Sequence, residues 1–302
     1  MRFAITGGCG FIGSQLSIHL LELGYDVRVI DKIAIGSSPY WSGFDYSKID
    51  YCEVDICSPG DMDECFKDVD YVFHLASYAR IKDCLANPNL ARKINVGGTL
   101  NVLLAAEKNK VKRLVYTSSS SAYGDQDNLP WKEDMPIKLL NPYASTKYAG
   151  EILCQLFGEA NRLETVSLRL FNVYGSVSAI EGKVDCPSVV EILLKQKRND
   201  QALTIIGDGK QKRDLVNVKD VAKAFVAAST SKLVGKGEVI NIGSGSNYSV
   251  SEIANWIGGE TTKLDNRYAE AYETLADISK AKELLNWQPE HNLKDWIESN
   301  KK

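Results

Sequence analysis

The chain has 302 residues, of which 44% are apolar, enough to fill a sizeable core in one large domain or two moderate ones. Its 36 basic and 39 acidic side chains give a net charge of -3, and no long run of either sign occurs. This distribution offers no basic patch for nucleic acid or an anionic membrane. No apolar stretch approaches the roughly 18 residues of a membrane span. We therefore expect a globular protein that binds neither nucleic acid nor membrane.

Cysteine and histidine usage bears on location and on metal binding. The seven cysteines are odd in number and form no C-x-x-C pair, which favours reduced thiols over a disulfide framework. A predicted strand begins within two residues of Met1, without the basic and apolar regions of a signal peptide. The three histidines lie far apart, so we expect no metal site. These features indicate a cytoplasmic protein.

Short β-branched runs alternate with longer amphipathic stretches along the first part of the chain. The expected strands are Arg2–Thr6, Val27–Ile30, Cys52–Val54, Tyr71–Leu75, Arg113–Thr117, Val166–Leu170 and Glu238–Ile242. The expected helices span about 12–23, 61–67, 89–109, 143–161, 188–197, 219–230, 250–257, 279–285 and 293–299. The alternation predicts an α/β fold of the Rossmann type, a doubly wound parallel sheet with helices on both faces.

The pattern loosens after Gly175, where a loop holding Gly182 and Pro187 leads into a helix and then a turn-rich stretch. We expect residues 1–174 to form a first domain, to which residues 216–243 return. Residues 175–302 are expected to form a smaller C-terminal α/β region.

A glycine-rich segment, TGGCGFIGS at residues 6–14, follows the first predicted strand and opens the first predicted helix. Gly7, Gly10 and Gly13 let the backbone turn tightly, approach a pyrophosphate and pack the helix against the strand. The N–H groups at the helix start, at Phe11 and Ile12, attract the phosphates. A glycine triplet alone is a weak signal, but a strand before it and a helix after it form the context of a dinucleotide site.

An acidic residue, Asp31, ends the second predicted strand 18 residues beyond Gly13. Asp31 is expected to hydrogen-bond the adenosine ribose and to repel a 2′-phosphate, which favours NAD over NADP. The neighbouring Lys32, also expected near the cofactor, leaves NADP as an alternative. Further cofactor contacts are expected at the ends of the next two strands, from Asp55, Ile56, Leu75 and Ala76. For Asp55, and for His74 directly before Leu75, an ordinary strand-end role stays open.

A tyrosine and a lysine stand four residues apart in NPYASTKYAGE, residues 141–151, at a predicted helix start. This spacing places Tyr143 and Lys147 on one helix face. Since a tyrosine pKa lies near 10, a nearby ammonium is needed to favour the phenolate that accepts a proton from a substrate hydroxyl. Ser119, in the run LVYTSSSSAYG after a predicted strand, can hydrogen-bond the reacting oxygen, although serines at strand ends also serve as ordinary turns.

Ordered motifs along almost the whole chain resemble the extended short-chain dehydrogenase/reductase family, and within it the nucleotide-sugar epimerases of the UDP-glucose 4-epimerase kind. The motifs that carry the resemblance are TGGCGFIGS, HLA, INVGGTLNVL, TSSSSAYG, NPYASTK, RLFNVYG, GDGKQKRDLVNVKDV, NIGSG and ADISKAKELLNWQP. The resemblance implies a first domain that binds NAD and a C-terminal region that binds a nucleotide-sugar. It also implies a homodimer built on the helices 89–109 and 143–161.

The resemblance assigns roles to individual residues. Lys147 also binds the nicotinamide ribose, Ser119 is the catalytic hydroxyl, and Asn95 and Thr117 contact the cofactor. The residues that it places at the nucleotide-sugar are Ser119, Ser120, Ser121, Tyr143, Asn172, Arg213 and Arg267. Among these, Asn172 and the two arginines would hold the diphosphate, which guanidinium groups can grip bidentately.

The expected reaction is redox-neutral epimerisation at C4 through a 4-keto intermediate, with UDP-glucose and UDP-galactose as the pair. Sugar 4,6-dehydratases of this family carry an Asp-Glu pair where this chain has Ser120 and Ser121, so elimination lacks an acid. A 4-ketoreductase, or an epimerase acting at another carbon, uses the same centre and stays an alternative. The modest size of Thr274 keeps N-acetylated sugars open as substrates. A non-catalytic NAD-binding sensor would be expected to have lost Tyr143 or Lys147, and neither is missing.

Overall fold

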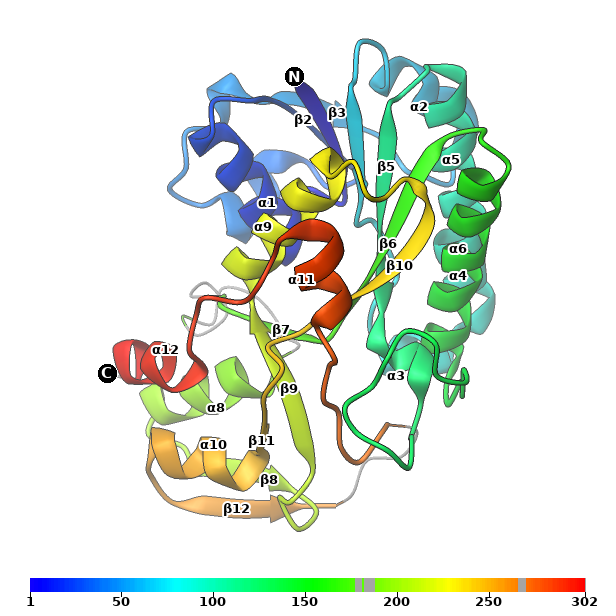
Figure 1. Ribbon diagram of the computed structural model, residues 1–302. Helices are drawn as coiled ribbons and strands as arrows, with labels where there is room; N and C mark the ends of the chain where they lie inside the picture. Colours follow the sequence, from blue (N-terminus) through cyan, green and yellow to red (C-terminus); the bar gives the residue numbers. More distant parts are fainter. Residues whose placement is uncertain (177–180, 182–187, 266–269, 302) are drawn as a thin grey trace.

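Seven parallel strands form the central sheet of the computed structural model, which describes residues 1–176, 181, 188–265 and 270–301. The strands are β1 (Arg2–Thr6), β2 (Asp26–Asp31), β3 (Asp50–Glu53), β4 (Tyr71–His74), β5 (Arg113–Ser119), β6 (Glu164–Leu170) and β10 (Lys236–Ile242). Their order, β10-β6-β5-β4-β1-β2-β3, confirms the predicted Rossmann-type sheet (Figure 1). The order reverses between β1 and β4, the place where such sheets bind ligands.

Helices cover both faces of the sheet (Figure 1). One face carries α1 (Phe11–Glu22), α9 (Val218–Thr230) and α11 (Ser279–Leu285). The other carries α2 (Pro59–Cys65), α5 (Thr99–Lys108) and α6 (Pro142–Glu159). In the part of the chain that is described, none of the helices combines the length and the apolarity that a bilayer crossing requires.

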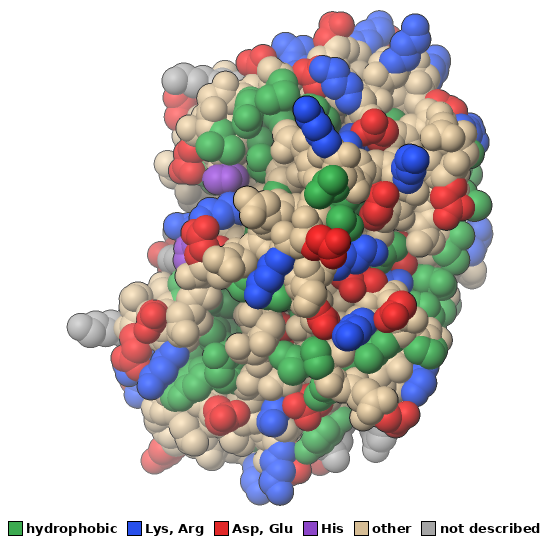
Figure 2. Space-filling model, viewed as in Figure 1, with side chains coloured by type: hydrophobic (Ala, Val, Ile, Leu, Met, Phe, Trp, Pro, Cys, Tyr) green, Lys and Arg blue, Asp and Glu red, His purple; other side chains and the backbone are tan. Residues whose placement is uncertain are grey.

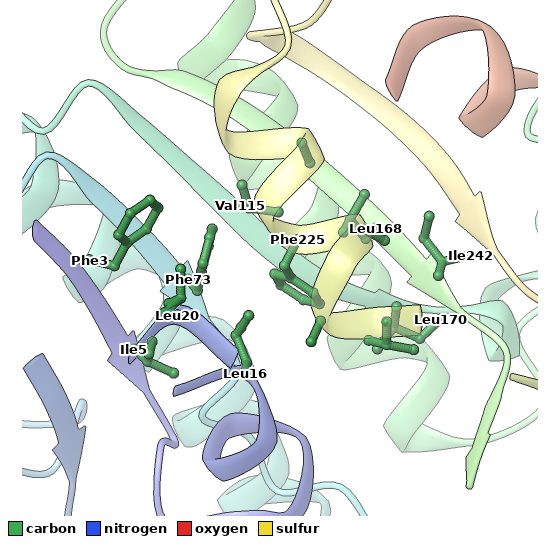
Figure 3. Close-up of a cluster of buried hydrophobic side chains, with 14 of the residues drawn as sticks. Phe3, Ile5, Leu16, Leu20, Phe73, Val115, Leu168, Leu170, Phe225 and Ile242 are labelled. Atoms are coloured by element: carbon green, nitrogen blue, oxygen red, sulfur yellow. The ribbon is translucent and has the colours of Figure 1, made fainter. Parts of the chain in front are cut away.

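The core is divided by the sheet into two layers, because successive side chains of a strand point to opposite faces. Phe3 and Ile5 of β1 pack with Leu16 of α1 and Phe225 of α9 on one side (Figure 3). Ala4, between them in sequence, belongs to the other layer with residues of α2, α5 and α6. Strands buried on both faces therefore read as continuous apolar runs in the sequence.

The C-terminal part adds two small sheets below the central one (Figure 1). Their strands are β7 (Asn172–Tyr174), β9 (Lys212–Asn217) and β11 (Asn247–Ser249) in one sheet, and β8 (Leu203–Ile206) and β12 (Thr261–Leu264) in the other. The helices α8 (Val189–Arg198), α10 (Val250–Ile257) and α12 (Leu293–Asn300) pack there around a third apolar cluster. These short strands were not predicted from the sequence.

The helical segment predicted at 89–109 is helical up to Lys108 but is not uniform. It consists of α4 (Pro88–Arg92), a π-helical turn η4 (Lys93–Gly98) and α5. Such π turns occur often at functional sites. Further short helices absent from the prediction are α3 (Ile81–Ala86), η1 (Ile35–Ser37), η2 (Pro39–Trp41), η3 (Tyr46–Lys48) and η5 (Ser120–Tyr123).

A buried ion pair anchors α6 to the sheet. Arg169 of β6 donates from Nη2 to Oε1 of Glu151 at 2.7 Å and from Nε to Oε2 at 3.0 Å. Ser118 donates to the same carboxylate at 2.6 Å, and the guanidinium lies 4.6 Å from the ring centroid of Tyr123. Since Glu151 and Arg169 are 0% and 4% exposed, neither charge can be left without the other.

We expect Arg169→Met to lower the free energy of unfolding by about 3–5 kcal/mol, because it leaves the Glu151 carboxylate buried and unpaired. Arg162→Met is the matched control: Arg162 also pairs with a glutamate and covers a ring, that of Phe157, but it lies at the surface. Urea unfolding should show a far smaller loss for the control. Equal losses would contradict the anchoring role of the buried pair.

Candidate active site

The glycine-rich loop joins β1 to α1 in a conformation that only glycine fits at two positions. Gly7 has φ +73°, and a Cβ on Gly13 would lie 2.2 Å from the Gly7 carbonyl oxygen. Gly10, directly before α1, has no side chain with which to cap the first turn, which leaves the helix start open to an anion. The loop therefore fits the pyrophosphate of a dinucleotide, and the roles of Phe11 and Ile12 there stay predictions.

Asp31 lies at the end of β2 beside this loop. Its carboxylate accepts hydrogen bonds from the backbone N–H of Cys9 at 2.9 Å and of Ile33 at 3.1 Å. Burial raises the pKa of Asp31, and these backbone donors oppose the rise. A carboxylate has about four lone-pair sites, so lone pairs remain for ribose hydroxyls. Lys32 beside it is exposed.

The other predicted cofactor residues fall into different environments. The carboxylate of Asp55 accepts a hydrogen bond from the Cys57 N–H at 2.9 Å, which lowers the pKa of Asp55. The neighbouring Ile56 is buried against α5 and η4. Leu75 and Ala76 border the glycine loop, since a Cβ on Gly7 would lie 2.6 Å from the Ala76 nitrogen.

The side chains of Thr117 on β5 and His74 on β4 differ in whether the protein satisfies their hydrogen-bonding atoms. The Oγ1 atom of Thr117 is buried and has no hydrogen-bond partner among the described residues. His74 has partners on both ring nitrogens, Thr6 at 2.7 Å and Thr99 at 2.9 Å. Burial lowers the pKa of His74 to about 3, so it is a neutral bridge between β4, β1 and α5.

Asn95, predicted to contact the cofactor, lies in the π turn η4 with its side chain bonded within the protein. Its Oδ1 accepts from Tyr78 N–H at 2.7 Å, and its Nδ2 donates to the Tyr78 carbonyl and to Thr146 Oγ1. Thr146 stands on α6 between Tyr143 and Lys147. Asn95 therefore ties the segment that follows β4 to the helix that carries the predicted catalytic pair, and its contact with the cofactor stays a prediction.

The structure brings the predicted catalytic residues together. Asn141 caps α6 by accepting from Ala144 N–H at 2.9 Å, which fixes the helix start that carries Tyr143. Burial raises the pKa of Tyr143, and a hydrogen bond with the Ser119 side chain opposes the rise. Ser119 ends β5, and its Oγ also lies 2.6 Å from Oγ of Ser121. A chain of hydroxyls therefore leads to the phenol.

Lys147 is carried into the interior by α6 and is 2% exposed. Its Nζ lies 4.4 Å from the ring centroid of Tyr116, a cation–π contact. Burial lowers the pKa of Lys147 to about 7, while Glu151 one turn further along acts in the opposite direction. Lys147 therefore changes between its charged and neutral forms near neutral pH.

The other predicted nucleotide-sugar residues, apart from Arg267, lie in η5 and in the small sheet of the C-terminal part. Ser120 is nearly buried in η5, and Asn172 is exposed at the start of β7. The Arg213 guanidinium donates to the carbonyls of Lys212 and Tyr272 and pairs with Glu270 at 3.3 Å. Arg267 lies outside the described residues.

Thr274 lies beside β9, and its hydroxyl accepts a hydrogen bond from the Asp214 N–H at 3.0 Å.

In the described ranges, no three His, Cys, Asp or Glu side chains come close enough to hold a metal. Figure 2 shows basic and acidic side chains interspersed over the face it views.

Three residues of the site were missed from the sequence: Tyr116, Glu151 and Arg169. Glu151 had a usable signal, because it follows Lys147 by four residues and so continues the helix face of Tyr143 and Lys147. Arg169 is a lone charge within an apolar strand, a pattern that predicts a buried partner. Tyr116 had no signal beyond that of an ordinary core aromatic.

The fold and the site are those of a Rossmann-type dinucleotide-binding enzyme. The family model described as "NAD dependent epimerase/dehydratase family" matches residues 3–243. The chain belongs to this family.

Three relatives illustrate its members. The UDP-glucose 4-epimerase of Mycolicibacterium smegmatis is 32% identical over 310 residues, covering 98% of this chain and 96% of that protein. The crystal structure of UDP-glucose 4-epimerase from Thermotoga maritima with UDP-glucose has a TM-score of 0.90 at 30% identity, covering 99% of this chain and 97% of that one. UDP-N-acetylglucosamine 4-epimerase from Methanobrevibacter ruminantium, in complex with UDP-N-acetylmuramic acid, has a TM-score of 0.90 at 28% identity, covering 99% and 96%.

The lowered pKa of Lys147 predicts how stability depends on pH. The folded-state pKa is about 7 and the unfolded value about 10.4, so the chain takes up a proton on unfolding between these values. The Lys147 contribution to stability therefore rises with pH across this window. Lys147→Met, which keeps the apolar stem, should lack that rise.

We expect Lys147→Met to be more stable than the wild type near about pH 7, by a margin that shrinks towards about pH 10. Urea unfolding of both chains, freed of nucleotide, measures the margin at each pH. A margin that does not change with pH would show that the charge on Lys147 carries no such penalty.

Proposed function

We propose that this protein catalyses NAD-dependent epimerisation of a UDP-sugar at C4 through a 4-keto intermediate, interconverting UDP-glucose and UDP-galactose. The observation that carries the proposal is the placement of the Tyr143 phenol beside the Ser119 side chain, with the buried Lys147 one helical turn away. These groups lie at the carboxyl ends of the parallel strands, on the same side as the glycine loop. The family named above and its 4-epimerase relatives agree with this reaction.

Proton transfer is the task of Tyr143. The phenolate removes the proton of the sugar 4-hydroxyl, and Ser119, hydrogen-bonded to the phenol, holds the same oxygen. The Lys147 ammonium, one helical turn from Tyr143, would favour the phenolate, which burial alone disfavours. In the second half of the cycle Tyr143 returns the proton to the 4-oxygen.

When bound, NAD would supply the redox chemistry of the cycle, which is reversible hydride transfer at C4 of the sugar. The open helix start after Gly10 would hold its pyrophosphate, and Asp31 would hold the adenosine ribose. Thr117, with its buried and unpartnered hydroxyl, would bind on the nicotinamide side of the site. The net reaction leaves the cofactor in its starting state.

The C-terminal region would bind the nucleotide part of the substrate. We assign residues 1–174, with 216–243, to a NAD-binding domain and residues 175–302 to a nucleotide-sugar-binding region. Arg213, Arg267 and Asn172 would hold the diphosphate while the 4-keto sugar turns over. The backbone anchors of Arg213 support this role, because they fix a guanidinium whose charge a diphosphate can share with Glu270.

Ser120 and Ser121 argue against elimination. Ser120 is nearly buried, and Ser121 is hydrogen-bonded to Ser119. Neither can act as the carboxylic acid that a departing hydroxyl requires. Epimerisation therefore fits this centre better than dehydration does.

We also propose that the protein is a homodimer and that it is located in the cytoplasm. The outer faces of α5 and α6 expose four large apolar side chains, Leu100, Leu104, Ile152 and Leu156. Their burial against the same helices of a second copy would give a four-helix interface with two-fold symmetry. The six cysteines of the described residues are free thiols, which is consistent with a reducing compartment.

Replacing Tyr143 by phenylalanine removes the proton acceptor and keeps the ring. We expect Tyr143→Phe to lower kcat by about 10²–10⁴-fold, while the affinity for NAD stays unchanged. Tyr148→Phe on the same helix is the control and should retain full turnover. Full turnover by Tyr143→Phe would remove Tyr143 from the catalytic role.

A sugar panel tests the reaction itself. The purified chain is incubated with UDP-glucose, UDP-galactose and their N-acetyl forms without added cofactor, and the products are separated. Interconversion supports the epimerase, because its NAD stays bound between turnovers. A strict need for added reduced cofactor would instead show a 4-ketoreductase.

A further inference from the structure

The segment after β2 folds back against the outside of the glycine loop. It contains η1, Ser38 and η2, and its residues Ser38 and Trp41 are 5% and 1% exposed. Ser38 Oγ donates to the Cys9 carbonyl at 2.7 Å, and Trp41 Nε1 donates to the Gly8 carbonyl at 3.1 Å. Two donors from one segment therefore contact two successive carbonyls of the loop.

Each of these two peptide units is held at both ends. The Gly8–Cys9 unit accepts from Trp41 through its oxygen and donates to Asp31 through its N–H at 2.9 Å. The Cys9–Gly10 unit accepts from Ser38 and donates to the Gly7 carbonyl at 3.0 Å. With both ends bonded, neither peptide plane is free to rotate.

The fixed peptide units lead directly into the open start of α1. Gly10 is both the end of the second unit and the residue before the helix, whose first-turn N–H groups it leaves without a side-chain cap. On the same side, the ring of Tyr40 stacks on that of Phe11 with centroids 5.9 Å apart. The segment thus also contacts the first residue of the helix that would receive the pyrophosphate.

We propose that Ser38 and Trp41 are positioning residues for the dinucleotide, which hold the glycine loop in its binding conformation and thereby slow the release of NAD. A binding loop that is already ordered loses less conformational freedom when its ligand arrives. The inference rests on the proposed function, in which one NAD molecule must stay bound while hydride leaves the sugar and returns. Slow release is the property that such a cycle requires.

Trp41→Phe tests the inference against a matched control, Trp287→Phe. Both indoles are buried, at 1% and 4% exposure, and both donate to a backbone carbonyl, Trp287 to that of Asp220 at 2.9 Å. The two variants thus lose the same atoms and the same kind of hydrogen bond. Only Trp41 contacts the glycine loop.

The measurement is the rate at which labelled NAD leaves the holoenzyme during a chase with excess unlabelled NAD, with the Tm of each variant. We expect Trp41→Phe to release NAD about two- to tenfold faster than the wild type, the factor for one hydrogen bond. Trp287→Phe should release NAD at the wild-type rate despite a comparable fall in Tm. Wild-type release by Trp41→Phe, or equally fast release by both variants, would overturn the inference.

A second pair covers the case in which Trp41→Phe does not fold. Ser38→Ala removes the donor to Cys9, and Ser229→Ala, which loses a 2.7 Å bond to the Val226 carbonyl, is its control. The same contrast in release rate is expected, and its absence would overturn the inference. A wild-type chain that holds no NAD at all would overturn the proposed function as well, so the two failures are distinguishable.

Discussion

Helix α6 must keep a lysine cation in an interior that disfavours charge. Burial lowers the pKa of Lys147 to about 7, and only local groups hold the ammonium against this cost. The Tyr116 ring lies under Nζ, and the Glu151 carboxylate follows one turn along the helix. The Glu151 carboxylate can stay charged in the interior because Arg169 pairs with it through two hydrogen bonds.

The same constraint explains why the site is built on rigid elements. Asn95 fixes the segment that follows β4 to α6 through Tyr78 and Thr146, and the buried ion pair fixes α6 to β6. On the cofactor side, the segment after β2 holds the glycine loop from outside. A cycle in which hydride leaves and returns benefits from such a frame, since the cofactor and the proton acceptor keep their places while the sugar turns over.

The sequence predicted the parts of the site that depend on local backbone rules. The glycine loop, the position of Asp31 and the spacing of Tyr143 and Lys147 follow from strand, turn and helix geometry. The predicted central strands are confirmed within a few residues because each is a buried apolar run. The strands of the small sheets were missed since several are only three or four residues long and half exposed, so they carry little hydrophobic pattern.

Contacts between residues far apart in the chain could not be predicted in this way. Tyr116 meets Lys147, and Trp41 meets Gly8, only after the sheet has brought their elements together. In both pairs, the sequence around one residue gives no sign of its partner. Asn95 shows the limit most clearly, because nothing in the sequence indicated that its side chain is bonded to Tyr78 and Thr146.

The central claim is that hydride leaves C4 of the sugar and returns to the same carbon. The direct measurement uses UDP-glucose labelled with deuterium at C4, converted by the enzyme in ordinary water and analysed by mass spectrometry and NMR. The account predicts UDP-galactose that retains the deuterium at C4, since hydride held on bound NAD does not exchange with solvent. Loss of the label to water would contradict the account, because it would show that the carbon-bound hydrogen leaves as a proton.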